Sequence, residues 1–197
     1  MKVIDISQEL FSCAVYPGDP APERKRLSSL ELGDPCNLTA LSLCAHNGTH
    51  IDAPNHFIRD GKTVDRLSPE VFVGPAWVAF RDGDVTAADA LRMLDDARAA
   101  GAGERLLIGG AATVTPEAAE VFASSGLRLI GNESQTFGSP ADHREVHRIL
   151  LGAEVVLLEG IRLGGAAAGR YFLFSAPLNL GGSDGAPCRA MLIAGME

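Results

Sequence analysis

Residues 46–57 read HNGTHIDAPNHF, and we expect the rest of the chain to be organised around this stretch. It holds three of the five histidines of the chain and one aspartate, namely His46, His50, Asp52 and His56. Neutral imidazole and carboxylate groups are the usual protein ligands of zinc and related divalent cations. Gly48 and Pro54 favour a bent segment over a long helix. The pattern predicts that several ligand atoms converge on a metal ion, and the alternative is a polar turn whose histidines cap backbone groups.

A second group of candidate ligands lies about a hundred residues further along the chain. His143 and His147 are four residues apart, so a helix places them on one face. The apolar run VVLL at 155–158 is followed directly by Glu159. Burying an isolated carboxylate destabilises the folded state unless a cation pairs with it. We expect His147 and Glu159 to join the first cluster; the alternative pairs Glu159 with backbone amides or Arg162 and leaves His147 to cap its helix.

Composition and charge narrow the class of protein. The 197 residues are 46% hydrophobic and 21% charged, which predicts one globular domain spanning residues 1–197. The formal charge of −8, without a Lys/Arg run, does not favour nucleic acid or an anionic membrane as partner. Asp5 interrupts the first apolar run, which is atypical of a signal peptide. The four cysteines form no CxxC pair, so we expect reduced thiols and a cytoplasmic location.

The apolar patterning predicts an α/β domain built on a mixed β-sheet with packed helices. Helices are expected from Thr86 to Ala100, from Thr115 onward, and from Asp142 to Gly152, where Glu145 completes a capping box. Strands are expected at 2–6, 24–32, 37–43, 71–80, 105–108, 127–130, 155–158, 171–175 and 188–193. Because the histidine stretch directly follows the 37–43 strand, we expect that strand to give the site a rigid base.

The histidine stretch also carries a family resemblance. HNGTHIDAPNHF resembles the HxGTHxDxPxHF signature of the metal-dependent cyclase family, which includes bacterial kynurenine formamidase and isatin hydrolase. Four other blocks resemble the same family: DIS at 5–7, YPGD at 16–19, VHRILLGAEVVLLEGIRL at 146–163 and FSAPLNLGGSDGAPCRAML at 174–192. The resemblance implies a compact, swivelling β/β/α-like fold. It also implies a homodimer or homotetramer, since members of the family commonly form dimers or tetramers.

The resemblance also implies a two-metal site. One metal ion is expected on His46, His50 and Asp52, and the second on Asp52, His147 and Glu159, with the Asp52 carboxylate bridging the two. The implied cofactor is two Zn²⁺ ions, with Mn²⁺ as the alternative. His56 is the implied proton-transfer residue, and Tyr16, where the formamidases have Trp, is expected to line the substrate pocket. His143 matches nothing in the family pattern, so we interpret it as a residue of the helix surface.

The implied activity is hydrolysis of a small-molecule amide by metal-activated water, with an aryl formamide similar to N-formylkynurenine or a cyclic amide as substrate. Two alternatives remain at this point. A cyclase, lyase or lactonase could use the same metals on another carbonyl compound, and a non-catalytic protein could bind metal without turnover. The segments 131–138 (GNESQTFG) and 106–122 depart from the formamidase pattern, so we expect both to shape the pocket.

Overall fold

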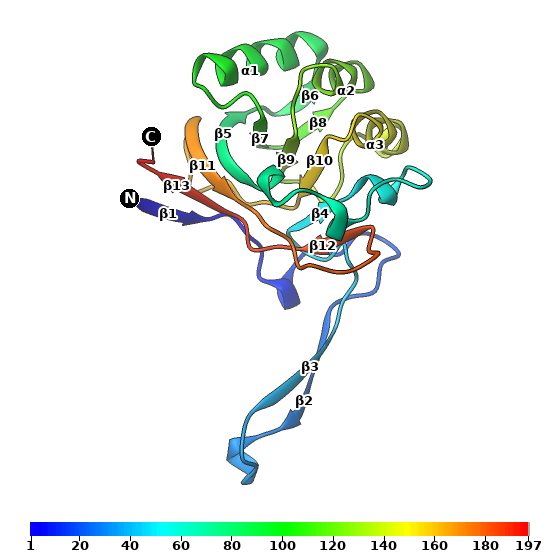
Figure 1. Ribbon diagram of the computed structural model, residues 1–197, viewed down its shortest axis with the longest axis vertical. Helices are drawn as coiled ribbons and strands as arrows, with labels where there is room; N and C mark the ends of the chain where they lie inside the picture. Colours follow the sequence, from blue (N-terminus) through cyan, green and yellow to red (C-terminus); the bar gives the residue numbers. More distant parts are fainter. Residues whose placement is uncertain (197) are drawn as a thin grey trace.

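A mixed sheet of nine strands forms the centre of the computed structural model, which describes residues 1–196 (Figure 1). From one edge to the other, the strands are β1 (Lys2–Asp5), β13 (Met191–Ala194), β11 (Gly169–Phe174), β5 (Val73–Phe80), β7 (Arg105–Gly109), β9 (Leu129–Asn132), β10 (Val156–Glu159), β4 (His50–Asp52) and β12 (Gly185–Pro187). The central strands β5, β7, β9 and β10 run parallel, and the other pairings in this sheet are antiparallel. The predicted α/β fold with a mixed sheet is confirmed.

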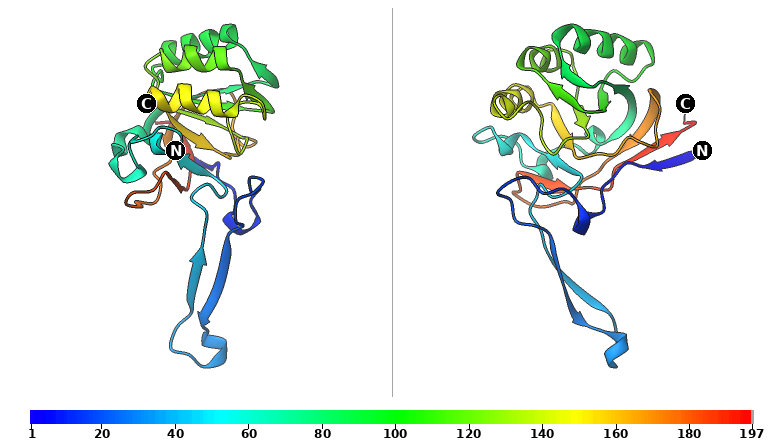
Figure 2. Two further views of the ribbon diagram at one scale, coloured as in Figure 1. Left: turned by 90° about the vertical axis from the view of Figure 1, so that its right-hand side faces the viewer. Right: turned by 180° about the vertical axis from the view of Figure 1, so that it is seen from behind.

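Three α-helices in the described part of the chain cover one face of this curled sheet (Figures 1 and 2). They are α1 (Ala87–Ala99), α2 (Pro116–Ala123) and α3 (His143–Gly152). Each helix joins two neighbouring parallel strands, because a parallel pair needs a crossover connection. The third crossover matters most for function, since it runs from β9 through α3 to β10 and carries two of the predicted ligands.

The starts of α1 and α3 show where a capping box was correctly predicted from the sequence and where it was not. Thr86 and Asp89 form the predicted capping box of α1, with each side chain accepting a hydrogen bond from the other residue's backbone N–H. The capping box predicted for α3 is wrong. The side chain of Asp142 makes no cap hydrogen bond, because its carboxylate accepts a hydrogen bond from the Ser139 hydroxyl at 2.7 Å instead.

The apolar core lies on both faces of the sheet, so its central strands are buried on two sides. In β7, Leu106 and Ile108 pack in the cluster beneath the helices, which includes Phe122 of α2. Leu107 points the other way, into a second cluster that includes Ile51 of β4. This alternation explains why the central strands read as continuous apolar runs rather than as alternating polar and apolar residues.

A two-stranded arm projects from the body of the molecule (Figures 1 and 2). It consists of β2 (Glu23–Ser28) and β3 (Leu38–Ser42), which pair with each other and form a sheet of their own. The strand predicted at 37–43 therefore exists, and the one predicted at 24–32 ends at Ser28, because Leu30–Leu32 form a 3-10 helix. Both strands lie outside the main sheet. The prediction that the 37–43 strand supports the histidines is wrong, because the support comes from β4.

Only the second half of the strand predicted at 188–193 is confirmed, because Cys188 makes an isolated bridge with Pro177 and β13 begins at Met191. Gly185–Pro187 forms β12, which pairs with β4, whereas Met191–Ala194 forms β13, which pairs with β1 and β11. The chain thus switches from one end of the sheet to the other between the two strands. As a result, the loop before β12 lies against the histidine stretch.

The remaining elements are short. A parallel pair, β6 (Gly83–Val85) and β8 (Ala112–Val114), flanks the helices. The 3-10 helices are η1 (Leu10–Ser12), η2 (Leu30–Leu32), η3 (Pro54–His56), η4 (Val64–Arg66) and η5 (Pro69–Val71). Across residues 1–196, every helix is too short or too polar to span a bilayer.

Candidate metal centre

Strand β4 carries two of the predicted ligands into the main sheet. His50 and Asp52 are separated by one residue, so both side chains point to the same face, while Ile51 enters the apolar core on the other. Glu159, at the end of β10, lies directly opposite His50 in the antiparallel register. All three polar side chains are buried. Strand pairing thus brings together ligands that are about a hundred residues apart in the chain.

The turn before β4 places His46 beside Asp52. Gly48 has a φ of +65°, a conformation that side-chain-bearing residues rarely adopt, so this turn requires glycine. The hydroxyl of Thr49 donates to the carbonyl of Gly160 at 2.8 Å and fastens the turn to the end of β10. With the turn held there, His46 Nδ1 donates to Asp52 Oδ1 at 2.8 Å.

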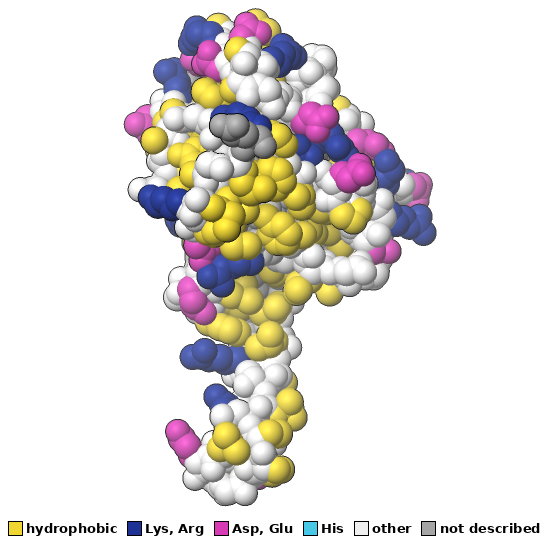
Figure 3. Space-filling view, turned by 60° about the vertical axis from the view of Figure 1, so that its left-hand side comes forward, with side chains coloured by type: hydrophobic (Ala, Val, Ile, Leu, Met, Phe, Trp, Pro, Cys, Tyr) yellow, Lys and Arg dark blue, Asp and Glu magenta, His cyan; other side chains and the backbone are white. Residues whose placement is uncertain are grey.

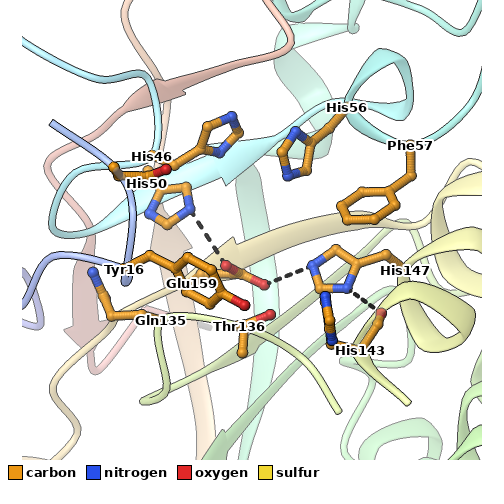
Figure 4. A pocket seen from close by; sticks show the side chains of 11 residues that line it. Tyr16, His46, His50, His56, Phe57, Gln135, Thr136, His143, His147 and Glu159 are labelled. Atoms are coloured by element: carbon orange, nitrogen blue, oxygen red, sulfur yellow. Dashed lines mark hydrogen bonds and ion pairs between the residues drawn. The ribbon is translucent and has the colours of Figure 1, made fainter. Parts of the chain in front are cut away.

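Backbone carbonyls fix the rings of His50 and His147. His50 Nδ1 donates to the carbonyl of Gly48 at 3.0 Å, and His147 Nδ1 donates to the carbonyl of His143, one turn back in α3, at 2.6 Å. The Nε2 atoms then face the cluster and lie 3.4 Å and 3.2 Å from the two carboxylate oxygens of Glu159 (Figure 4). One nitrogen held by an outer acceptor and the other aimed at a centre is the usual arrangement of metal-ligating histidines.

Asp52 shows that the cluster suits a cation. Its side chain is 1% exposed, and Oδ2 has no hydrogen-bond partner although it is buried. A buried carboxylate oxygen without a partner is costly. The nearest histidine nitrogens, His147 Nε2 at 3.6 Å and His56 Nε2 at 4.0 Å, lie beyond hydrogen-bond distance of this oxygen. A divalent cation would satisfy it, so the donor set fits the metal implied by the sequence.

The structure brings the five predicted ligands together around Asp52. Two groups have ligand atoms within 4.8 Å of one another: His46 with Asp52 and His56, and His50 with Asp52 and Glu159. Asp52 belongs to both groups, as a bridging carboxylate would. His147 Nε2 completes the cluster beside Glu159. The division of these ligands between two ions stays a prediction.

The charges in the cluster make protons compete with a metal ion for the same histidine nitrogens. Burial lowers the pKa of His46, but its hydrogen bonds to Asp184 and Asp52 outweigh this effect and raise the pKa to about 10. Burial likewise lowers the pKa of His147, whereas Asp52 and Glu159 raise it to about 10. Burial raises the pKa of Asp52, yet the neighbouring histidines hold it well below its usual range. In the metal-free protein, protons therefore occupy nitrogens that a metal ion would use, and metal binding releases them.

His56 lies at the edge of the cluster, in the short helix η3 that follows Pro54. Its side chain is 27% exposed, in contrast to the buried His50 and His147. Its Nδ1 donates to the carboxylate of Asp184 at 3.2 Å. Asp184 is a site residue that our sequence reasoning missed. The available signal was an acidic residue within the glycine-rich GGSDG segment that leads into a strand.

A cleft of about 190 Å³ opens beside the cluster. Tyr16, which the family resemblance assigned to the substrate pocket, lines this cleft. Phe57 lies near the other end of the cluster, with its ring centroid 4.5 Å from that of His147 (Figure 4). Gln135, from the divergent 131–138 segment, also lines the cleft, whereas no residue of 106–122 does, so the second segment was wrongly expected to shape it. His143 was interpreted as a helix-surface residue, but it is half-buried and forms part of this wall.

Comparison with known proteins places the chain in a family. The family model described as "Putative cyclase" matches residues 4–139, which include the histidine stretch. The kynurenine formamidase of Salinibacter ruber is 33% identical over 98% of this chain and 97% of its own length. The chain belongs to the cyclase family. A second member, the kynurenine formamidase of Bacillus anthracis, is 35% identical over 97% of both chains.

Solved structures agree with the family assignment. A structure described as a potential metal-dependent hydrolase with cyclase activity is 26% identical and superimposes with a TM-score of 0.83, covering 97% of this chain and 96% of that one. An isatin hydrolase bound to the product analogue thioisatinate superimposes with a TM-score of 0.82 at 21% identity, covering 97% and 91% of the two chains. The second likeness concerns the fold alone. The cyclase-family α/β fold predicted from the sequence is confirmed.

Proposed function

We propose that this protein is a metal-dependent amidohydrolase that cleaves the C–N bond of a small aryl formamide or cyclic amide. The observation that carries the proposal is the unpartnered Asp52 Oδ2, buried among histidines and Glu159 that themselves line a cleft. The names of the curated relatives support the substrate class, since a kynurenine formamidase acts on a formamide of an aryl compound.

We propose His46, His50 and Asp52 as the ligands of one ion and Asp52, His147 and Glu159 as those of a second. Imidazole and carboxylate donors suit Zn²⁺, with Mn²⁺ as the alternative. A cation at this position supplies Lewis-acid activation of water and of the substrate carbonyl. The supporting observations are the outward anchoring of the ring nitrogens and the burial of the carboxylates.

His56 is the proposed proton-transfer residue. Its Nδ1 is held by Asp184, so the lone pair of the neutral ring lies on Nε2, which faces Asp52. The ring is reachable from the cleft because it is not fully buried. It can accept a proton from the attacking water and deliver it to the leaving nitrogen, which converts a poor leaving group into a neutral amine.

The cleft fits a single substituted aromatic ring. A cavity of about 150 Å³ holds a benzene molecule, and this cleft measures about 190 Å³. Tyr16 and Phe57 supply apolar ring faces, which favour stacked or edge-on packing of an aromatic substrate. The side chain of Gln135 donates to the carbonyl of Ala14 at 2.7 Å, so it ties the 131–138 segment to the loop that leads to Tyr16.

Isotope labelling tests the proposal directly. The protein is assayed with N-formylkynurenine, isatin and a panel of lactones in ¹⁸O-labelled water, before and after metal removal by a chelator. The expected result is metal-dependent cleavage of an amide with one labelled oxygen in the carboxylate product. Product without label would support a cyclase or lyase, cleavage of lactones alone a lactonase, and metal binding without turnover a non-catalytic protein. Each of these three results contradicts the proposal.

We propose a second copy of the chain as the protein partner, giving a homodimer or homotetramer. An isolated two-stranded hairpin is only marginally stable in water, yet the arm formed by β2 and β3 projects away from the body. Hydrophobic side chains run along it and continue onto the body (Figure 3). The leucines of the arm that are at least half exposed are Leu27, Leu30, Leu32, Leu38 and Leu41.

A groove lined in part by Leu41 of the arm, Leu43 and Leu178 offers a second apolar surface. Large exposed apolar patches on soluble proteins usually mark an interface. Sedimentation should therefore show a dimer or tetramer that Leu38→Glu and Leu41→Glu dissociate. Leu91→Glu is the matched control, because Leu91 is 52% exposed on α1, away from the arm. A monomeric wild type would refute this assembly.

We also propose a reducing, cytoplasmic location. The support is that all four cysteines (Cys13, Cys36, Cys44 and Cys188) are free thiols in the structure. Disulfides are rare in reducing compartments, whereas secreted chains usually pair their cysteines. Fractionation of cells that express the protein tests this location, and recovery from the extracellular fraction would contradict it.

A further inference from the structure

Asp184 occupies a position that the backbone holds firmly against the candidate metal centre. Its carbonyl accepts a hydrogen bond from the N–H of Ala53 at 2.9 Å, immediately after β4. The preceding carbonyl, that of Ser183, accepts from the N–H of Val64 at 2.9 Å. The following residue, Gly185, begins β12 and lies opposite Asp52 in the sheet. Asp184 is thus anchored from both sides even though it belongs to a loop.

One oxygen of the Asp184 carboxylate contacts two histidines of the site. Oδ2 accepts a hydrogen bond from His46 Nε2 at 2.9 Å and another from His56 Nδ1 at 3.2 Å. The two rings are tilted against each other, with centroids 4.1 Å apart and an interplanar angle of 30°. The opposite nitrogens face Asp52: His46 Nδ1 lies 2.8 Å from its Oδ1, and His56 Nε2 lies 4.0 Å from its Oδ2.

We propose that Asp184 is a positioning residue, whose single carboxylate oxygen fixes the orientation and tautomer of both His46 and His56. When His56 donates from Nδ1, its neutral ring must carry the lone pair on Nε2, the atom that faces the centre. When His46 donates from Nε2, its Nδ1 is the atom left for a metal ion. Carboxylates that accept from the outer nitrogen of a ligand histidine fix the ring and raise its basicity. This inference rests on the proposed function for the role of His56.

The packing of Gly185 against His46 also supports a positioning role for Asp184. The Asp184 side chain is 43% exposed, so by itself it resembles an ordinary surface carboxylate. However, a Cβ at the neighbouring Gly185 would lie 2.8 Å from His46 Cε1. The absence of a side chain at this position therefore leaves space for the His46 ring in the orientation that Asp184 holds.

The test compares Asp184→Asn and Asp184→Ala with the control Asp65→Asn. Asp65 Oδ1 accepts from the N–H of Gly182 at 3.0 Å, so the control neutralises a carboxylate that is bound to the same loop without touching a histidine. Three properties are measured: the Zn²⁺ affinity of the metal-free protein against a chromophoric chelator, the tautomer of His56 from ring ¹⁵N shifts of the Zn²⁺-loaded protein, and turnover. We expect both Asp184 variants to lose roughly 10–100-fold in Zn²⁺ affinity and in turnover. The His56 ring should no longer be held in the Nδ1–H form.

A double variant shows whether Asp184 acts through His56. On a His56→Ala background at saturating Zn²⁺, Asp184→Asn should have no further effect on turnover, whereas its effect on Zn²⁺ affinity should persist through His46. Asp184 variants that match the control in all three measurements would overturn the inference. An unchanged His56 tautomer would also overturn it, as would an undiminished loss of turnover in the double variant. If the wild type turns over no amide, the proposed function fails, but Zn²⁺ affinity and the His56 tautomer still decide the role of Asp184.

Discussion

Replacing Gly185 by alanine should disturb the metal centre without removing any functional group. Gly185 is buried at the start of β12, between β4 and the ring of His46. An added Cβ would lie 2.5 Å from the carbonyl oxygen of Ile51 and 2.8 Å from His46 Cε1. Neither distance is tolerated, since real Cβ contacts essentially never fall below 3.0 Å.

The structure also sets the size of the effect. Reaching 3.0 Å from the Ile51 oxygen requires a movement of about 0.5 Å, and the first obstacle is backbone rather than a flexible side chain. Overpacking of this kind costs about 1–3 kcal/mol of folding stability. The same movement displaces the His46 ring or carries Asp184 away from it. We therefore expect a loss of roughly 10–100-fold in Zn²⁺ affinity, as for other disruptions of the groups that orient a ligand.

Gly181→Ala is the matched control for this prediction. Gly181 lies in the same loop, its added Cβ would meet no heavy atom within 4 Å, and its φ is not in the left-handed range. It should change the stability by less than about 1 kcal/mol. Urea unfolding of the metal-free proteins measures the first effect, and chelator competition for Zn²⁺ measures the second. If Gly185→Ala matched Gly181→Ala in both assays, the reasoning about the packing around His46 would be refuted.

Four further predictions concern the histidines and Asp52. His56→Ala should keep the wild-type metal content and lose ~10²–10⁴ in turnover, measured on one preparation; a joint loss of metal and turnover would make His56 a ligand instead. Asp52→Ala should lose more than one ion by elemental analysis, because both proposed ions share this carboxylate, and a full complement would exclude the bridging role. His147→Ala should empty one metal position while His143→Ala leaves the metal content unchanged; the reverse result would mean that the helix ligand is misassigned. In the metal-free protein, the pKa values of about 10 for His46 and His147 lie above the unfolded value of about 6.5, so their stabilisation is complete below that pH and disappears as the pH rises toward 10. Urea unfolding should show stability declining from about pH 6.5 toward pH 10, and a rise in stability over this range would contradict the prediction.

The sequence alone was sufficient to predict those features whose residues lie close together in the chain. The spacing of His46, His50 and Asp52 identified candidate ligands, since a turn followed by two alternate positions of a short strand brings such residues together. The capping box of Thr86 and Asp89 located the start of α1, because its hydrogen bonds join residues only three positions apart. Glu159 could be singled out because a carboxylate that ends an apolar strand is buried with it.

The resemblance to the cyclase family supplied what these local signals lacked. Spacing within the chain leaves His143 and His147 equivalent, since both lie on one face of α3. The pairing with Glu159 favoured His147, the family pattern then excluded His143, and the structure places His147 Nε2 against Glu159 and Asp52. His143 instead turns its Nδ1 toward the carbonyl of Pro140 at the start of the helix, so it reaches the cleft but not the cluster.

Tertiary structure alone decided which segments meet. When β4 pairs with β10 and β12, His50 lies opposite Glu159 on one side and Pro187 on the other. No local sequence pattern encodes contacts between residues so far apart in the chain. The same pairing brings Asp184 to His46 and His56, a role that its glycine-rich surroundings did not reveal. The position of the β2–β3 arm outside the main sheet could not be predicted for a related reason. Alternation within a strand predicts the strand but not the strand that it pairs with. Residue spacing thus determined the chemistry of the donors, and long-range strand pairing determined where that chemistry is assembled.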